Sequence, residues 1–323
     1  MLLWLAIGDA FGAGFEFADP AIVAQLNYPS IGYQPHPKGT IKAGRYTDDT
    51  QLTLGLLMYM MQDKRTPVAL ARAFVMAFKR DPRQGYDTRF YEFLKSVKNG
   101  TEFLQSIQPH SDRAGAAMRA TPCGLLPTVE EALDLAVFQA SITHATRDGM
   151  NSAAACAAMV WACRNGIDPG YLPTYLNDVV PGYHWEIPHV GPVGNRGIQV
   201  VRAAVTLVSN YQGDPNALLQ EAVAFTGDVD TVACIAMAAA SFLPQVVELE
   251  PILVHGLENG NFGKAYLEDL DAKLLAAFPV VPPPQEEPEE QVAILALTTD
   301  PEQMVMVDPM GDTELDNPLG ELF

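Results

Sequence analysis

The chain has 323 residues, of which 48% are apolar, with 39 acidic and 20 basic side chains and a formal charge of -19. This composition supports a full hydrophobic core in one large or two small domains. It argues against nucleic acid as a partner, because phosphates need a basic face, and against docking on an anionic membrane. No uncharged apolar run reaches the ~20 residues that span a bilayer, and no signal-peptide pattern is evident, so we expect a cytoplasmic protein.

The first segment of interest is GDAFGAGFE, residues 8–16. Its glycines follow the order G-x-x-x-G-x-G with no strand before them, so the dinucleotide fingerprint, which needs G-x-G-x-x-G between a strand and a helix, is excluded. The glycines are better explained by close packing of a helix against a neighbour. Glu16, which closes the segment, is a candidate acid.

The tetrad Thr47-Asp48-Asp49-Thr50 stands directly before an apolar helical run. Thr and Asp both favour helix N-termini, so taken alone the tetrad is explained by capping.

The residues that follow predict helices that are long and rich in Ala, Leu and Met, with apolar residues at three-four spacing. Thr66-Pro67 and Pro127-Thr128 mark helix starts, and Asn165-Gly166 marks a helix end. Alternating strand patterns are almost absent. The predicted helical runs lie at 52–62, 67–80, 128–145, 150–166 and 231–243, and another helix is expected from Gly197. The stretch 171–199, rich in Pro, Gly, His and Tyr, predicts a long irregular loop.

The sequence Gly227-Asp228-Val229-Asp230-Thr231 again places two carboxylates and a threonine hydroxyl before an Ala-rich helix. Four carboxylates that converge without a nearby cation repel one another, and divalent cations relieve that repulsion. Carboxylate and hydroxyl oxygens select Mg²⁺, Mn²⁺ or Ca²⁺ rather than zinc. About 180 residues separate the two clusters, so the sequence alone does not show that they meet.

The four cysteines, Cys123, Cys156, Cys163 and Cys234, have no Cys-x-x-Cys spacing. This excludes a zinc knuckle and a disulfide scaffold, and isolated thiols in apolar surroundings suit a reducing compartment. We expect Cys156 and Cys163 to be buried on one helix face.

Residues 281–323 contain eleven acidic side chains and no Lys or Arg, which leaves 28 acids against 20 bases in residues 1–280. The stretch VVPPPQEEPEE opens this region and cannot continue a helix. We therefore expect a helical domain over 1–280 and an acidic, flexible C-terminal tail over 281–323. The alternative is a tail segment that folds back or docks on a partner.

Four motifs, in this order, resemble those of the ADP-ribosylglycohydrolases, the group of the dinitrogenase-reductase-activating glycohydrolase and the ADP-ribosylhydrolases. They are GDAFGAGFE, GRYTDDTQLTL, SITHATRDGMNSAAA and FTGDVDTVACIAMAAA, within about residues 1–275. The resemblance implies a compact, orthogonal multi-helix all-α domain with a binuclear Mg²⁺ (or Mn²⁺) centre in a cleft. It also implies that the metal ligands are Thr47, Asp48, Asp49, Asp228, Asp230 and Thr231.

The resemblance further implies that Glu16 lies over the substrate ribose and moves like a flap, and that Thr143 and His144 line an ADP-ribose pocket. Cleavage at the ribose C1 passes through an oxocarbenium-like state, with a carboxylate as general base. Asp228, Asp230 and Glu16 are the catalytic candidates, and the sequence does not choose between them.

One loop departs from the family pattern. The family commonly has G-N-G-x-x-M-R-x-x-P around the phosphates, whereas residues 113–122 read RAGAAMRATP. Gly115 and the Met-Arg pair match, but Arg113 and Ala114 replace a glycine and an asparagine. An arginine here either supplies charge to a phosphate or alters substrate recognition. Ser111 offers a further hydroxyl to a phosphate.

Three hypotheses follow. The first is a Mg²⁺-dependent hydrolase that removes ADP-ribose from a modified protein, most often from arginine. It would reverse a regulatory modification or one imposed by an ADP-ribosyltransferase or toxin. The second is a catalytically weak protein that binds ADP-ribose or blocks a partner, for example an immunity protein acting by steric occlusion. The third is a hydrolase of a small ADP-ribose derivative or another N-ribosyl compound.

Overall fold

The computed structural model describes residues 1–62 and 65–279, and within these residues the chain forms helices joined by loops. Pairing between extended segments of the described chain is confined to three isolated bridges, so the all-α prediction is confirmed. The predicted acidic tail lies outside the described residues. The α-helices are α1 (Leu2–Ala13), α2 (Pro20–Leu26), α3 (Asp48–Met60), α4 (Pro67–Arg80), α5 (Thr88–Ser96), α6 (Gly100–Ser106), α7 (Val129–Ser141), α8 (Arg147–Arg164), α9 (Leu172–Val179), α10 (Gly197–Ser209), α11 (Pro215–Ala224), α12 (Val229–Ala240), α13 (Pro251–Gly256) and α14 (Lys264–Ala277). Short 3₁₀ helices are η1 (Pro29–Ile31), η2 (Ala114–Ala116), η3 (Thr121–Leu125) and η4 (Pro169–Tyr171).

The predicted helix boundaries are set by side-chain caps. Thr66 caps α4 with Pro67 in its first turn, and Thr128 forms a capping box with Glu131 at the start of α7. Asn165 is the C-terminal cap of α8. These contacts satisfy backbone groups that a helix end leaves unpaired, which explains why the elements begin and end where the sequence predicts.

Helix α12 is buried along its whole length and packs against α1, α8, α10 and α11. Its contact with α1 depends on two glycines. A Cβ on Gly8 would stand 2.4 Å from the carbonyl oxygen of Ala233, and one on Gly12 would stand 2.4 Å from Cα of Asp230. The interpretation of these glycines as helix-packing residues is confirmed.

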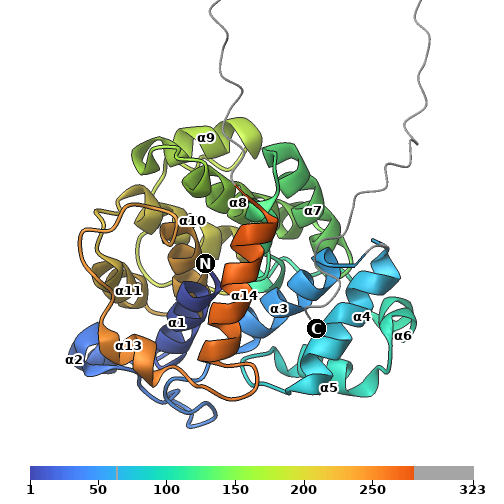
Figure 1. The fold of residues 1–323 in the computed structure, drawn as a ribbon, viewed down its shortest axis with the longest axis horizontal. Coiled ribbons are helices and arrows are strands. Elements are labelled where there is room, and N and C mark those ends of the chain that lie inside the picture. Colours follow the sequence, from blue (N-terminus) through green and yellow to red (C-terminus); the bar gives the residue numbers. More distant parts are fainter. Residues whose placement is uncertain (63–64, 280–323) are drawn as a thin grey trace, which may run out of the picture.

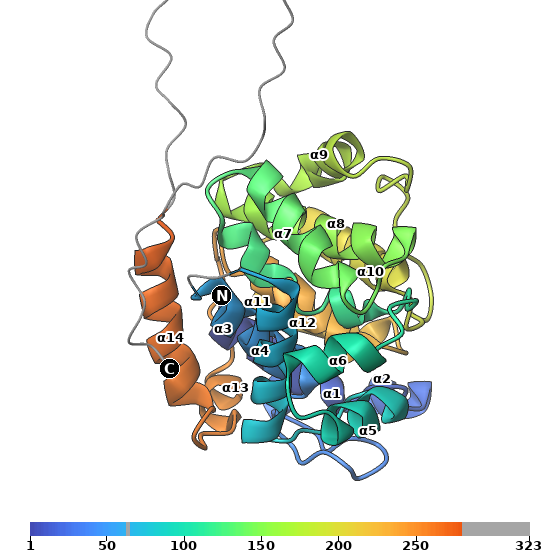
Figure 2. The same cartoon turned by 90° about the vertical axis from the view of Figure 1, so that its right-hand side faces the viewer.

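The remaining helices surround this centre. Helices α7, α8 and α9 form the upper part of both views in Figures 1 and 2. Helices α4, α5 and α6 form the right-hand side of Figure 1, which faces the viewer in Figure 2, while α14 (orange) lies on a different side, against α1. This arrangement leaves the N-termini of α3 and α12 in the interior.

Two sequence predictions need correction. Helix α7 ends at Ser141 rather than continuing to residue 145, because the N–H of Ala145 bonds to the carbonyl of Pro109 instead of extending the helix. The stretch 171–199 is not wholly irregular: 172–179 forms α9. Pro173 is tolerated in its first turn, and Leu172 and Leu176, one turn apart, are both buried.

All four cysteines are buried free thiols, which confirms the burial predicted for Cys156 and Cys163. A search of residues 1–62 and 65–279 finds no helix with the length and apolarity needed to cross a membrane.

Candidate active site

The first acidic cluster lies at the N-terminus of α3. The hydroxyl oxygen of Thr47, the N-cap, accepts a hydrogen bond from the backbone N–H of Asp49 (3.3 Å) and donates to Oδ2 of the same residue (3.1 Å). Asp48 and Asp49 occupy the first helical turn, where the helix dipole favours negative charge. Capping therefore accounts for Thr47, whereas the two carboxylates are held at a helix end without capping it.

The second cluster lies at the N-terminus of α12. Gly227 has φ of 92°, and a Cβ there would stand 1.9 Å from the carbonyl oxygen of Val193, so the turn requires glycine. Asp228 is the N-cap residue, and its Oδ1 accepts a hydrogen bond from the hydroxyl of Thr231 (2.8 Å). Asp230 stands in the first turn, with Oδ1 near the backbone N–H of Thr231 (3.0 Å).

The fold brings the two clusters together at one cavity of about 1050 Å³. Thr47 is the predicted ligand that does not line it: its side chain lies fully buried behind Asp49. All the other predicted site residues line this cavity, namely Glu16, Asp48, Asp49, Ser111, Gly115, Thr143, His144, Asp228, Asp230 and Thr231.

The carboxylates of this cavity are poorly stabilised by the protein alone. Burial, and then repulsion from neighbouring carboxylates, raises the pKa of Asp48, Asp49 and Asp230 well above the usual value for aspartate. Burial raises the pKa of Asp228 to about 6, and the negative charge of Glu16 adds to the rise.

The donor set fits divalent cations. Oδ1 of Asp49 is buried and has no hydrogen-bond partner among the described residues. One carboxylate oxygen from each of Glu16, Asp228 and Asp230 lies within 4.8 Å of the others, a spacing that allows three ligands to one cation. An unpaired buried oxygen beside hard, anionic ligands suits Mg²⁺ or Mn²⁺.

Glu16 is held by a histidine that the sequence analysis did not single out. The backbone N–H of Lys38 donates to Nδ1 of His36 (3.0 Å), so Nδ1 is an acceptor and Nε2 carries the proton. Nε2 lies 3.1 Å from Oε2 of Glu16 and donates to it. The bond fixes the carboxylate at the cavity wall, and within residues 1–62 and 65–279 Oε1 of Glu16 has no hydrogen-bond partner.

Asp9 is a second residue that the sequence analysis missed. Its buried carboxylate accepts hydrogen bonds from the backbone N–H groups of Thr47 and Thr50 and from the hydroxyl of Thr50 (2.6 Å). Asp9 does not line the cavity. It joins α1 to the N-terminus of α3 and so positions the turn that carries Asp48 and Asp49.

Another part of the cavity wall places the polar side chains of Thr143 and His144 beside the buried guanidinium of Arg119. Arg119, 1% exposed, donates to Oε1 of Gln139 (2.6 Å) and to the hydroxyl oxygen of Thr143 (2.7 Å). That oxygen lies 2.7 Å from Nδ1 of His144. Arginine can only donate, so the Thr143 hydroxyl accepts from Arg119, and either its hydrogen or its second lone pair meets Nδ1 of His144, according to the imidazole tautomer.

The imidazole of His144 stands close to Gly115: a Cβ there would be 3.2 Å from Nε2. Burial, and then the positive charge of Arg119, lowers the pKa of His144 to about 3. His144 is therefore a neutral imidazole beside the 111–115 segment over the whole physiological pH range.

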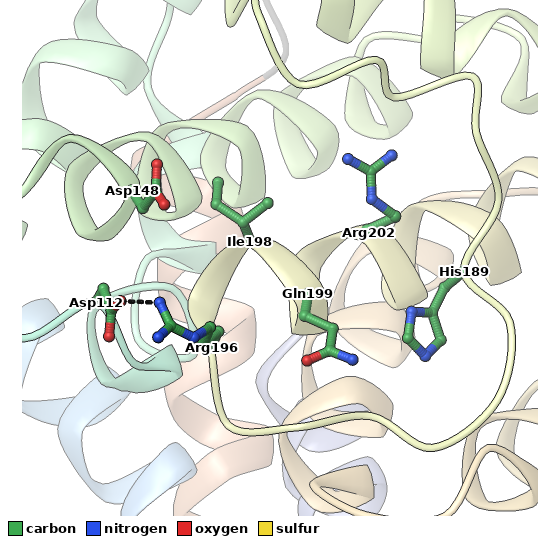
Figure 3. A pocket seen from close by; sticks show the side chains of 7 residues that line it. All are labelled: Asp112, Asp148, His189, Arg196, Ile198, Gln199 and Arg202. Atoms are coloured by element: carbon green, nitrogen blue, oxygen red, sulfur yellow. Dashed lines mark hydrogen bonds and ion pairs between the residues drawn. The ribbon is translucent and has the colours of Figure 1, made fainter.

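A smaller surface pocket of about 280 Å³ lies beyond the same segment (Figure 3). Its charges are matched within the protein. Arg196 pairs with Asp112, and Arg202 donates to the carbonyl groups of Tyr183, His184 and Ile187.

An all-α fold whose cleft collects carboxylates from two helix N-termini defines a class of protein suited to binding divalent cations at that cleft. The family model described as ADP-ribosylglycohydrolase matches residues 1–281, so this chain belongs to that family.

Three individual similarities accompany this match, and the names of two of them agree with it. The chain is 32% identical over 155 residues to the ADP-ribosyl-[dinitrogen reductase] glycohydrolase of Rhodospirillum rubrum, covering 44% of this chain and 49% of that protein. It is 27% identical over 168 residues to an uncharacterised protein of Archaeoglobus fulgidus, covering 50% and 53%. The chain thus spans about half the length of these curated relatives. A solved structure titled ADP-ribosylglycohydrolase-related protein complex has a TM-score of 0.62 at 21% identity, covering 86% of this chain and 95% of that one, which supports the fold.

Proposed function

We propose that this protein is a hydrolase that removes ADP-ribose from ADP-ribosylated protein, with arginine as the linked residue. The observation that carries the proposal is the convergence of the two acidic clusters on one cavity, where Oδ1 of Asp49 is buried without a partner. Family membership supports the reaction class, and the name of the Rhodospirillum rubrum relative, an ADP-ribosyl-[dinitrogen reductase] glycohydrolase, supports a protein as the substrate by analogy. Arginine as the linked residue is part of the proposal.

The proposed ligands for two Mg²⁺ or Mn²⁺ ions are the five cluster residues that line the cavity, Asp48, Asp49, Asp228, Asp230 and Thr231. Thr47 completes the proposed set, but its hydroxyl would have to turn away from Asp49 to reach a cation. Such ions, when bound, orient a ribose diol and acidify a water. The chain's own contribution is a rigid carboxylate array. Helix ends and the bonds from Asp9 hold the array before any ligand arrives.

The proton of the attacking water needs a carboxylate base as the bond at ribose C1 breaks. Glu16, Asp228 and Asp230 are the proposed candidates, since one oxygen of each lies within 4.8 Å of the others. Thr143 and His144, with Ser111 and Gly115, are proposed to bind the ADP-ribose. Because burial lowers the pKa of His144 to about 3, its imidazole is too weak a base for this role.

The test is the release of free ADP-ribose from an arginine-ADP-ribosylated protein, with and without Mg²⁺. We expect release by the wild type with Mg²⁺ and a loss of roughly 100-fold or more in Asp230→Ala. Asp168→Ala is the matched control, because Asp168 caps η4 and does not line the cavity. Circular dichroism confirms folding of both variants.

Release that is unchanged in Asp230→Ala contradicts the assignment of this centre. If ADP-ribose is released from a serine-linked substrate but not from an arginine-linked one, the proposed linkage is wrong and the proposed reaction class stands. ADP-ribose binding without release from any substrate favours the second hypothesis, a protein that blocks an ADP-ribosyltransferase, a toxin or another partner.

A further inference from the structure

The side chain of Arg113 lines the large cavity. The side chain is 53% exposed. Its Nη1 donates to Oδ2 of Asp87 at 2.6 Å. The guanidinium therefore has a defined position at the cavity wall rather than extending freely into solvent.

Asp87 is built to hold that position. It is the N-cap of α5, and its Oδ1 accepts hydrogen bonds from the backbone N–H groups of Arg89 (2.9 Å) and Phe90 (3.4 Å). Burial by itself raises the pKa of Asp87. The two backbone hydrogen bonds and the bond from Arg113 together lower it by more, so the pKa lies below the usual value for aspartate and the carboxylate stays ionised. Oδ1 is committed to the cap, which leaves Oδ2 for Arg113.

The ion pair adds little to the stability of the fold. Both side chains are about half exposed, and such pairs contribute about 0–1 kcal/mol. Within residues 1–62 and 65–279, one of the five N–H donors of the guanidinium is hydrogen-bonded, the one that meets Asp87. The pair thus orients Arg113 while leaving donors for a second anion.

The surroundings of Arg113 favour an anionic ligand. Ser111 and Gly115 line the same cavity, and Nε2 of the neutral His144 imidazole lies beside Gly115. Arginine binds phosphate through two parallel hydrogen bonds, a geometry that a lysine does not reproduce.

A second arginine nearby, Arg196, serves as a control for the role of Arg113. Arg196 pairs with Arg113 in an isolated antiparallel bridge, and its own side chain is ion-paired with Asp112. Arg196 lines the smaller surface pocket and not the large cavity (Figure 3). The two arginines are alike in exposure and pairing but differ in the space they face.

We propose that Arg113 binds the diphosphate group of a nucleoside-diphosphate ligand, and that the diphosphate replaces Asp87 as the counter-ion of Arg113. The identity of the ligand rests on the proposed function. The placement of the cation rests on the geometry described above.

The experiment is calorimetric titration of the full chain with ADP and with adenosine, both in EDTA. We expect Arg113→Ala to weaken ADP binding by about 10- to 100-fold and to leave adenosine binding unchanged. Arg113→Lys should recover part of the loss, and Arg196→Ala should match the wild type. Asp87→Asn, which preserves the cap, should tighten ADP binding by about two- to fivefold, because it removes a competing anion.

Several results would overturn the inference: ADP that does not bind the wild type, an Arg113→Ala loss below twofold, or an equal loss for adenosine. An equal effect of Arg196→Ala would also overturn it, because general surface charge would then explain the binding. The inference and the proposed function can be tested separately. If the protein hydrolyses its substrate but ADP binding does not depend on Arg113, only the inference is contradicted. If ADP binding depends on Arg113 but no substrate is hydrolysed, only the proposed function is contradicted.

Discussion

Asp9 shows how a residue outside the cavity controls the residues within it. Its carboxylate is fully buried, supplies no surface to the cavity, and accepts the hydrogen bonds that fix Thr47 and Thr50. Residues that orient metal ligands in this way commonly change metal affinity by 10- to 100-fold when altered. Asp9 is therefore expected to affect cation binding without contacting a cation.

The substitution Asp9→Asn tests this role. Its amide nitrogen would oppose backbone N–H donors, so we expect the free energy of unfolding to fall by about 1–3 kcal/mol, measured in denaturant. We also expect Mn²⁺ affinity, measured by calorimetry, to fall by about tenfold or more. Asp19→Asn is the matched control, because Asp19 caps the exposed start of α2 and asparagine caps equally well. Unchanged Mn²⁺ affinity in Asp9→Asn would show that Asp9 serves the fold alone.

At the scale of elements, the contact of α1 with α12 sets the position of the second acidic cluster. The methyl group of Gly12→Ala would meet backbone atoms of Asp230 at 2.4 and 2.7 Å, which no side-chain rotation relieves. We expect a loss of about 1–3 kcal/mol or more in the free energy of unfolding, together with weakened Mn²⁺ binding as the start of α12 moves. Thermal unfolding and calorimetry measure the two effects.

Gly256→Ala is the control for that substitution. It is also a helical glycine, but an added Cβ would come no closer than 3.3 Å, to the ring edge of Tyr33. Its effect should stay within about 1 kcal/mol. If Gly12→Ala is tolerated as well as Gly256→Ala, the close approach of α1 to α12 does not position the site.

The sequence predicts those features of the structure that depend on neighbouring residues better than those that depend on contacts between residues far apart in the chain. The ligand motifs are local: each pair of carboxylates stands directly before an apolar helical run, and both helices form where expected. Asp9 is different, because its partners lie 38 and 41 residues away. The available signal was a single charge within the apolar run LLWLAIGDAFGA, which forms α1.

The other omissions have the same cause. His36 reaches Glu16 through a loop whose course no periodicity predicts, and Arg119 acquires its role from partners on the following helix and beyond it. Helix α9 was missed because Pro173 suggests a loop, although proline is acceptable in a first helical turn.

At the scale of the whole molecule, the acidic cavity opposes folding in the absence of cations. Burial raises the pKa of Asp9 and Asp228 to about 6, above the unfolded value of 3.8. An acid whose folded pKa is raised destabilises the fold when ionised. That cost is fully present above the folded pKa and disappears as the pH falls towards 4. These carboxylates therefore make the cation-free protein more stable near pH 5.5 than near pH 7.5.

Divalent cations should counteract this loss of stability at higher pH. At a concentration about 100 times the Kd, Mn²⁺ or Mg²⁺ should stabilise the fold by about 2.7 kcal/mol, which corresponds to about 5 °C in Tm. The increase in Tm should be larger at pH 7.5 than at pH 5.5, because protons compete with the cation for the same oxygens.

The variant Asp49→Asn should raise the Tm of the cation-free protein and abolish the increase that cations cause. It removes the charge of a carboxylate whose Oδ1 has no hydrogen-bond partner among the described residues. Sodium chloride at matched ionic strength is the control. A Tm that responds equally to sodium and magnesium would mean that the buried carboxylates do not form a divalent-cation site.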